Sequence, residues 1–493
     1  MPYQGRQPGV GVRNRFIFTA TSGQTSFSGA DSNGLTLKYP DATYTDVFLN
    51  GVLLIPVTDY AATTKTSIVL SSGAAASDVL EVVAYEIASI ANTVPTSGGT
   101  FTGPLTVEGN FTADGGTIKL DGNYPVGTAN VALGDAAGAA ITSGGRNTLI
   151  GGSAGDALTV GQRNVVIGTD ALSADTQGSR SVAIGQAALA NQNFTSATDN
   201  YNVAVGFQAG VNVSTGTNNT LIGGLAGDAI TTGGYNVAVG ATALTANTTA
   251  SFNTAVGYQA AYSNTTGADN TAMGTAALYP NTTGNYNAAF GSASLRQNTT
   301  GSFNTALGQS ALNRNTTADY NTAVGYQSAY SNTTGERNTA MGVQSLYTNT
   351  TGSFNSAFGR ASLYYNTTGQ QNVANGQDAL FSNTTGSYNV AVGKSALETN
   401  TTASNATAVG YQAMYSNTTG GENVGVGREA LRSNTTGGSN TAVGYQAGNF
   451  TTTASNSTFI GRRAGYANTT GTGNTGIGGE AGLSLTTSSY NTA

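Results

Sequence analysis

Apolar and polar residues recur with a fixed spacing of 17 residues from residue 130 to the end of the chain. In a typical repeat, Asn253 is followed by Thr-Ala-Val and Gly257, and the polar segment Asn264-Thr-Thr-Gly comes later in the repeat. Small and large side chains alternate after the first Asn, as they do along a β-strand. A period held this tightly indicates one structural unit stacked many times. The pattern predicts a parallel β-roll or β-solenoid over 130–493, with two short strands in each repeat.

Two positions of the repeat vary little. They are the first Asn, which we call the anchor, and the Gly four residues after it. A position that admits no larger side chain is a packing contact or a corner with unusual backbone angles, whereas stacked Asn side chains can form amide ladders. We expect weaker repeats where Ser181, Ala406 and Ser457 replace the anchor. The Asn-Thr-Thr segment is expected to be a loop in which Asn supplies turn geometry. The residues chosen to represent these structural roles are Asn253, Gly257, Asn264, Asn270, Gly274, Asn321 and Gly325.

Short β-branched and aromatic segments separated by turn residues precede the repeats. The dipeptide Asn50-Gly51 lies between two of them and has the composition of a two-residue hairpin turn. We therefore predict a small antiparallel β-sandwich over 19–86. The segments expected to form strands are 16–18, 46–49, 52–55, 67–70 and 79–85.

The segments on either side of the predicted sandwich differ in character. Residues 1–18 are rich in Gly and Pro and carry Arg6, Arg13 and Arg15. This N-terminal arm is either a floppy terminus or a segment that docks onto an acidic surface of a larger assembly. Residues 87–129 are expected to form a short β stem between the sandwich and the repeats.

Two of these segments resemble parts of a known family. The stretch 47–54, followed by Asp59-Tyr60 and by 76–85, resembles the N-terminal module of bacteriophage tail fibre proteins, especially those of marine and cyanobacterial phages. Residues 98–107, with Gly-Gly-Thr before Gly-Pro-Leu, resemble the short stem repeat of the same fibres. The resemblance implies that the N-terminal domain attaches a fibre to virion tail or baseplate proteins, with Arg6, Arg13 and Arg15 as candidate docking residues.

Each repeat has few apolar side chains to bury, which bears on whether a single chain can form a stable core. Burying three or four small apolar side chains at ~25 cal/mol per Å² falls short of an ordering entropy of ~1–2 kcal/mol per residue. Three chains that share one core would remove this deficit. The Asn-x-Ala-x-Gly pattern is similar to the head repeats of trimeric autotransporter adhesins, although the period here is longer. That resemblance implies a homotrimer, whose shaft would be about 100 Å long at ~4.8 Å per repeat.

Composition excludes several function classes. The formal net charge is −6 and the repeats interleave basic with acidic residues, so there is no basic stripe and nucleic acid is not an expected partner. No apolar run is long enough to predict insertion into a membrane, and no secretory signal is visible. The chain has no Cys and no His, and its carboxylates are scattered over different repeat positions, so we expect no enzyme activity, no cofactor and no metal site.

Aromatic residues recur just before the anchors and nine residues after them. They are interpreted as ladders that cover the edges of the roll, with sugar-binding platforms as the alternative. Four extra residues fall between Ser181 and Asn202, and the segment 191–200 is predicted to be a bulged loop and not a site.

The sequence therefore predicts a homotrimeric phage tail fibre protein, located on the virion and extracellular in the mature particle. Its shaft would project toward the host and contribute to adhesion to a cell-surface polysaccharide or protein. The alternatives are a capsid-attached decoration fibre, a bacterial trimeric surface adhesin and a depolymerase spike. The chain ends at Ala493, part-way into a repeat, so we expect a tip domain to have been removed or encoded separately, or the chain to be a fragment.

Overall fold

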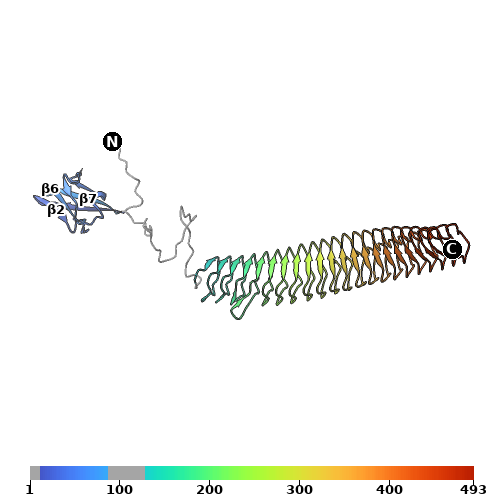
Figure 1. Ribbon diagram of the computed structural model, residues 1–493. Helices are drawn as coiled ribbons and strands as arrows, with labels where there is room; N and C mark the ends of the chain where they lie inside the picture. Colours follow the sequence, from blue (N-terminus) through green and yellow to red (C-terminus); the bar gives the residue numbers. More distant parts are fainter. Residues whose placement is uncertain (1–11, 87–127) are drawn as a thin grey trace. The chain divides into compact units, whose positions relative to one another are not determined.

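The computed structural model describes residues 12–86 and 128–493, which belong to two compact units (Figure 1). Arg6 and nearly all of the predicted stem lie outside the described residues. Apart from the short 3-10 helix η1 (Ala42–Tyr44), the regular structure of the described residues is β. The prediction of an all-β chain with a parallel β-solenoid is confirmed.

The N-terminal unit consists of two antiparallel sheets that share one core. The first sheet has the strand order β1-β7-β3-β4 and the second has the order β2-β6-β5. Phe16 from the first sheet and Ile68 from the second are buried in the same apolar cluster, as expected for a sandwich. The strands are β1 (Val12–Thr19), β2 (Gln24–Ser28), β3 (Thr45–Leu49), β4 (Val52–Leu53), β5 (Tyr60–Ala61), β6 (Ser67–Ala74) and β7 (Val79–Glu86).

The predicted hairpin turn is present between β3 and β4. Asn50 has φ of 49° and Gly51 has φ of 85°, so both central residues adopt the positive φ that such a turn requires. The Asn50 side chain accepts a hydrogen bond from the N–H of Val79 and donates one to Asp78. The turn is thereby fixed to the start of β7.

The sandwich begins earlier than the sequence indicated. Strand β1 pairs with β7 from Val12 to Thr19, so the last seven residues of the segment assigned to the N-terminal arm belong to the sheet. Arg13 and Arg15 are exposed while Phe16 and Phe18 are buried, which is the alternation of a strand with one face on a core. The Gly and Pro residues that precede β1 concealed this pattern.

The second unit is the solenoid, drawn from cyan to red in Figure 1. Each repeat contributes one three-residue strand that pairs in parallel with the strand of the next repeat. The paired residues are 17 apart, as Ala255 and Ala272 are, except across the insertion, where Val182 pairs with Val203. Among the described strands, no pairing joins β30 back to β8, so the 21 strands form one open ladder. They are β8 (Val131–Leu133), β9 (Thr148–Ile150), β10 (Val165–Ile167), β12 (Val182–Ile184), β14 (Val203–Val205), β15 (Thr220–Ile222), β16 (Val237–Val239), β17 (Thr254–Val256), β18 (Thr271–Met273), β19 (Ala288–Phe290), β20 (Thr305–Leu307), β21 (Thr322–Val324), β22 (Thr339–Met341), β23 (Ser356–Phe358), β24 (Val373–Asn375), β25 (Val390–Val392), β26 (Thr407–Val409), β27 (Val424–Val426), β28 (Thr441–Val443), β29 (Thr458–Ile460) and β30 (Thr475–Ile477).

The second strand predicted for each repeat is absent from the described solenoid. After Gly257 the chain makes a series of turns, with Gln259 at φ of 57° and Ala261 at φ of 48°. These turns still bond to both neighbouring repeats: the N–H of Gln259 donates to Ala241 and the N–H of Ala261 donates to Ala277. A fixed repeat spacing therefore does not distinguish a strand from a stack of turns, because both place their backbone bonds between successive copies.

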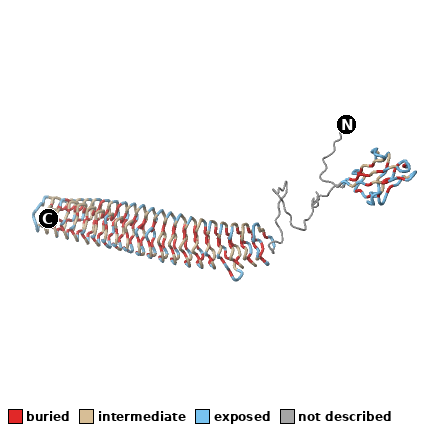
Figure 2. Tube along the Cα trace, turned by 180° about the vertical axis from the view of Figure 1, so that it is seen from behind, coloured by how far each residue is buried: buried red, intermediate tan, exposed pale blue. Residues whose placement is uncertain are grey.

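The core of the solenoid closes within a single chain. The interior is drawn in red in Figure 2. Ala255, Ala260 and Leu278 are fully buried, and so are Asn264 and, to within 1%, Asn253. The premise that three chains must share a core is therefore wrong, because two hydrogen-bonded amides per repeat fill much of the volume that was expected to be apolar. The homotrimer itself stays a prediction, but its chains would have to meet through their outer surfaces and not through a shared core.

Candidate functional site

The anchor Asn residues form a ladder along the solenoid. The backbone N–H of Asn253 donates to Oδ1 of Asn236 at 3.0 Å, and its own Nδ2 donates to the carbonyl oxygen of Gly267 at 2.9 Å. Asn270 and Asn321 make the same two bonds in their repeats. Each anchor side chain thus links two successive repeats by accepting a backbone N–H. The same side chain also bonds to a backbone carbonyl near the end of its own repeat.

A second buried ladder involves Asn264 and its equivalents. Nδ2 of Asn281 donates to Oδ1 of Asn264 at 2.7 Å, and Nδ2 of Asn264 donates to the carbonyl oxygen of Gly267 at 2.8 Å. Asn264 is fully buried. The Asn-Thr-Thr segment forms a loop as predicted, but its Asn side chain lies in the core. Within the segment, only the second Thr, such as Thr266, is exposed.

The Gly that follows each strand is required for two reasons. Gly257, Gly274 and Gly325 have φ of 134°, 139° and 130°, a region that L side chains rarely adopt. A Cβ on Gly257 would also lie 2.7 Å from the carbonyl oxygen of Gly274 in the next repeat. The corner and the close packing that the sequence suggested as alternatives therefore occur together.

The three anchor replacements differ in their consequences. Ser457 still accepts the N–H of Asn474 through its hydroxyl at 3.3 Å. Ala406 is fully buried and has no side-chain acceptor to offer to the N–H of Asn423 in the next repeat. Of the two, only Ala406 interrupts the ladder outright.

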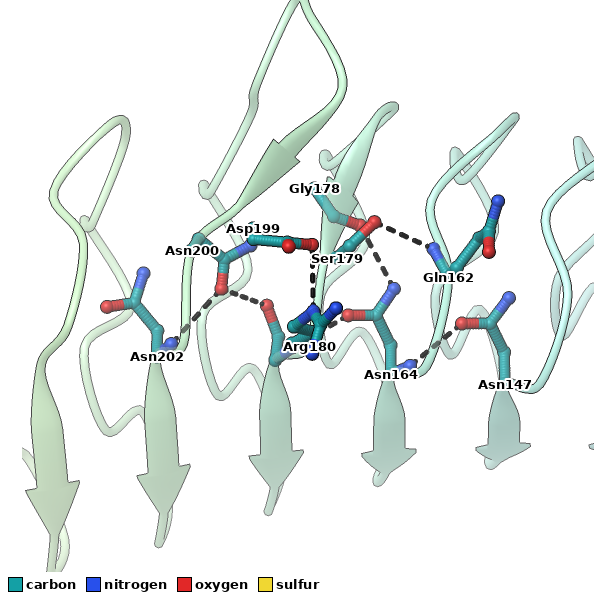
Figure 3. A network of polar contacts seen from close by, with 10 residues as sticks. Asn147, Gln162, Asn164, Gly178, Ser179, Arg180, Asp199, Asn200 and Asn202 are labelled. Carbon is teal, nitrogen blue, oxygen red and sulfur yellow. Dashed lines mark hydrogen bonds and ion pairs between the residues drawn. The ribbon is translucent and has the colours of Figure 1, made fainter.

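At Ser181 the inserted segment supplies the missing polar atoms (Figure 3). The hydroxyl of Ser181 donates to Oδ1 of Asn200 at 2.8 Å, and the same oxygen accepts the N–H of Asn202 at 3.1 Å. Asp199 forms an ion pair with Arg180 at 2.9 Å. The extra residues thus rejoin the two ends of the ladder, and the prediction of a bulged loop is confirmed in structure.

The base of the inserted segment contains a buried carboxylate. The short strands β11 (Gly178–Ser179) and β13 (Thr198–Asp199) pair in parallel there. Asp175 accepts hydrogen bonds from Nε2 of Gln192 at 2.6 Å and from the N–H of Gly178 at 2.9 Å. Burial nevertheless raises the pKa of the Asp175 carboxyl above its ordinary value. Asp175 occupies the repeat position that Asn fills in the second ladder.

The arginines proposed for docking lie on one edge of the sandwich, as far as they are described. Arg15 donates from its guanidinium to Glu81 at 2.9 Å, across β1 and β7. Arg13 lies two residues earlier on the same face and is exposed. The structure therefore places two of the three on a strand, and a partner would have to compete with Glu81 for Arg15.

Aromatic side chains stack on the outside of the solenoid. Phe303 lies between Tyr286 and Tyr320, at 4.9 Å and 5.0 Å between ring centroids. A second stack runs through Tyr330, Tyr347, Tyr364 and Phe381. These rings are stacked on one another along the solenoid, which agrees with the interpretation as ladders. Shorter stacks pair Tyr235 with Phe252 and Tyr262 with Tyr279.

The third residue of each strand forms an apolar stripe on the outer face of the strand ladder. Within each strand the middle residue points into the core, whereas the third is partly or fully exposed, as with Ala306 and Leu307. This stripe is apolar in every repeat except at Asn375. Its most exposed members are Leu133, Ile222, Met273, Leu307, Met341, Phe358, Val443, Ile460 and Ile477.

One hollow of about 420 Å³ interrupts the outer surface near the middle of the solenoid. Arg360, Tyr365, Asp378 and Glu398 contribute to its lining. Asp378 and Glu398 occupy different repeat positions, so the sequence alone does not indicate that they are neighbours. The folded solenoid brings both to the same hollow, since they come from adjacent repeats. The available signal was Tyr365, an aromatic residue at a repeat position where the two neighbouring repeats carry Thr348 and Ser382.

Neither metal ligands nor membrane spans are evident in 12–86 and 128–493. No three Asp or Glu side chains gather there in a way that could hold a metal ion. That part of the chain also contains no helix that could cross a lipid bilayer. Comparison of the chain with known protein families, with curated proteins and with solved structures finds no match.

Proposed function

We propose that this protein is a bacteriophage tail fibre protein that forms a homotrimer on the virion. Its N-terminal sandwich attaches to tail or baseplate proteins, and its solenoid projects from the mature particle toward the host. There it contributes to adhesion to a cell-surface polysaccharide or protein. No catalytic step is assigned to it.

The observation that carries the proposal is the combination of two separate units with different designs. The segment 47–54, which resembles phage fibre modules, is built around the β3–β4 hairpin of a small sandwich. The second unit is a ladder of 21 strands, with a length of about 100 Å at ~4.8 Å per strand. A small docking domain joined to a long, charge-poor solenoid suits a spacer between a particle and its target.

The apolar stripe supports assembly with further copies of the same chain. If each of its 20 apolar side chains covers roughly 50 Å², the stripe amounts to on the order of 1,000 Å² per chain, enough for a stable interface. Exposed apolar patches of this size usually mark interaction sites. A second copy of the chain is the partner that fits best, because its own apolar stripe has the same spacing between side chains and the same length. The resemblance to the repeats of trimeric adhesins predicts that three chains assemble.

The assembly is tested by sedimentation equilibrium of the purified protein. A mass near three times 49.4 kDa is expected. A stable monomer would contradict the homotrimer, and a dimer would retain the stripe as an interface while removing the trimeric arrangement.

The location is tested by labelling virus particles with gold-conjugated antibodies against the purified chain, using the phage whose genome encodes it. Label on the tail or baseplate is the expected result. Label on the capsid would favour the decoration fibre, and label on uninfected bacterial cells would favour the surface adhesin. Either result would overturn the tail fibre assignment.

A further inference from the structure

Tyr365 breaks the regular surface of the solenoid. At its repeat position the two neighbouring repeats carry Thr348 and Ser382, so Tyr365 is not part of a ladder of equivalent rings. The side chain is 47% exposed. It lines the hollow of about 420 Å³, which is within the size range of small-molecule sites.

The orientation of Tyr365 leaves one ring face available. Its neighbour Tyr364 is stacked on both faces, against Tyr347 at 5.0 Å and against Phe381 at 5.2 Å. Tyr364 meets Tyr365 at 4.7 Å with the rings 73° apart, and Phe381 of the same stack meets Tyr365 at 5.1 Å with the rings 84° apart. Because Tyr364 and Phe381 are stacked on each other and both lie nearly perpendicular to Tyr365, they present their edges to one face of Tyr365. The opposite face of Tyr365 is then turned away from the stack, unlike the rings in the ladder.

Polar groups surround this ring. Arg360 and Asp378 form an ion pair at 3.6 Å, and Asp378 also accepts a hydrogen bond from Gln377 at 2.9 Å. Glu398 lies on the same hollow and is close to the hydroxyl of Tyr415. Arg360 and Asp378 balance each other in charge, so the hollow carries one excess negative charge from Glu398. This charge opposes anionic ligands.

We propose that this hollow binds a neutral pyranose sugar, with the apolar face of the ring stacked on the outer face of Tyr365. Arg360, Asp378 and Glu398 supply planar donors and acceptors for the sugar hydroxyl groups. The hollow is lined by none of the residues of the apolar stripe. This proposal deepens the adhesive role and rests on the proposed function for its biological meaning.

The binding is tested on the purified full-length chain by saturation-transfer difference NMR. The probes are methyl β-D-glucopyranoside and methyl α-D-mannopyranoside, with methyl β-D-glucuronide and choline chloride as charged comparisons. We expect transfer to at least one neutral glycoside and at least fivefold less transfer to the other two probes. Preference for choline would identify a cation site, and the absence of transfer to any glycoside would also overturn the proposal.

Matched variants locate the site. Tyr365→Ser introduces the residue found at this repeat position in Ser382, and it should reduce transfer at least fivefold. Arg360→Gln introduces the residue found at Gln377 and should reduce it at least twofold. Tyr388→Ser removes another exposed ring, 55% accessible and outside the hollow, and should leave transfer unchanged. Circular dichroism checks that each variant is folded.

An unchanged signal in Tyr365→Ser or Arg360→Gln, or an equal loss in Tyr388→Ser, would overturn the site. These measurements need no virus particle. Loss of the sugar site and loss of the tail location are therefore separate results.

Discussion

At the scale of single residues, successive repeats are held together at a few tightly packed positions that tolerate few types of residue. The Gly after each strand is the clearest case, because its Cα packs against the backbone of the next repeat. The anchor Asn is the complementary case, since its amide replaces backbone partners that a coil of this shape cannot supply by itself. Substitutions at these positions are expected to act locally and to differ sharply from substitutions nearby.

Gly257→Ala should destabilise the solenoid locally by about 3 kcal/mol. The new Cβ would approach the Gly274 carbonyl oxygen to 2.7 Å, and φ of 134° would become strained. Gly224→Ala is the control, because nothing lies within 4 Å of a Cβ at that position. Hydrogen exchange of the peptides around each site measures the effect. Equal protection in the two variants would contradict the packing argument.

Ala406→Asn should stabilise its repeat by about 1 kcal/mol, the usual net contribution of one hydrogen bond. The new amide would give the N–H of Asn423 the acceptor that the equivalent N–H groups in most other repeats have. Ser457→Asn is the matched comparison, with a smaller expected gain because Ser457 already accepts the N–H of Asn474. Hydrogen exchange in peptides containing residues 406–423 provides the measurement. A loss of protection in Ala406→Asn would show that the repeat has no room for the amide.

At the scale of elements, one carboxylate in each unit shows how burial and hydrogen bonding shift a pKa in opposite directions. In the sandwich, Asp31 ties the segment after β2 to β1: it accepts the N–H groups of Ile17 and Leu35, both at 2.8 Å. The hydrogen bond from Ile17 makes the largest contribution to lowering the pKa of Asp31. In the solenoid, burial raises the pKa of Asp175. The segments around Asp31 and Asp175 should therefore respond differently to acid.

The sandwich should lose stability as the pH falls below ~4. Because the folded pKa of Asp31 is lowered, its contribution is present above the unfolded value of ~3.9 and is lost as the pH falls through the folded pKa. Asp31→Asn should reproduce part of the loss at pH 7, since its Nδ2 would face the N–H of Ile17. Hydrogen exchange in peptides from 12–86, corrected for the intrinsic rate, measures both effects.

The segment around Asp175 provides the internal comparison. A raised folded pKa means that the ionised carboxylate costs stability at neutral pH, and that this cost is removed as the pH falls through the folded pKa. Peptides from 170–200 should keep or gain protection over the pH range in which the sandwich loses it. Parallel losses in both regions would contradict the assigned roles of Asp31 and Asp175.

At the scale of the whole molecule, the proposed assembly depends on one face of the solenoid. The double substitution Leu307→Glu with Met341→Glu places two charges on the apolar stripe without touching the closed core. We expect at least a tenfold rise in the concentration at which the assembly dissociates, because the charges would be desolvated in the interface. Sedimentation equilibrium over a range of protein concentrations measures the change.

The matched control for this prediction is Thr317→Glu with Thr351→Glu. These residues belong to the same two repeats as Leu307 and Met341 and are exposed, but they lie outside the strand. Their substitution should leave the dissociation concentration unchanged. If both double variants dissociate equally, net charge and not the stripe controls assembly.

Much of the fold follows from local chemistry that can be read along the chain. The period of 17 residues requires a stack, the invariant Gly requires a tight corner, and Asn50-Gly51 requires a hairpin turn, because each depends on the backbone freedom or spacing of a few neighbouring residues. The period did not reveal that the second half of each repeat is a series of turns. Strands and stacked turns place the same small residues at the same spacing.

The sequence by itself determined the ladder, its direction of growth and the presence of a separate small β domain. Only the tertiary structure decided which side of each repeat faces inward. It placed Asn264 in the core and Leu307 outside, because burial depends on how the coil closes and not on the polarity of a single side chain. It also brought Tyr365, Asp378 and Glu398 to one hollow. Residues at different repeat positions become neighbours only when successive coils are stacked.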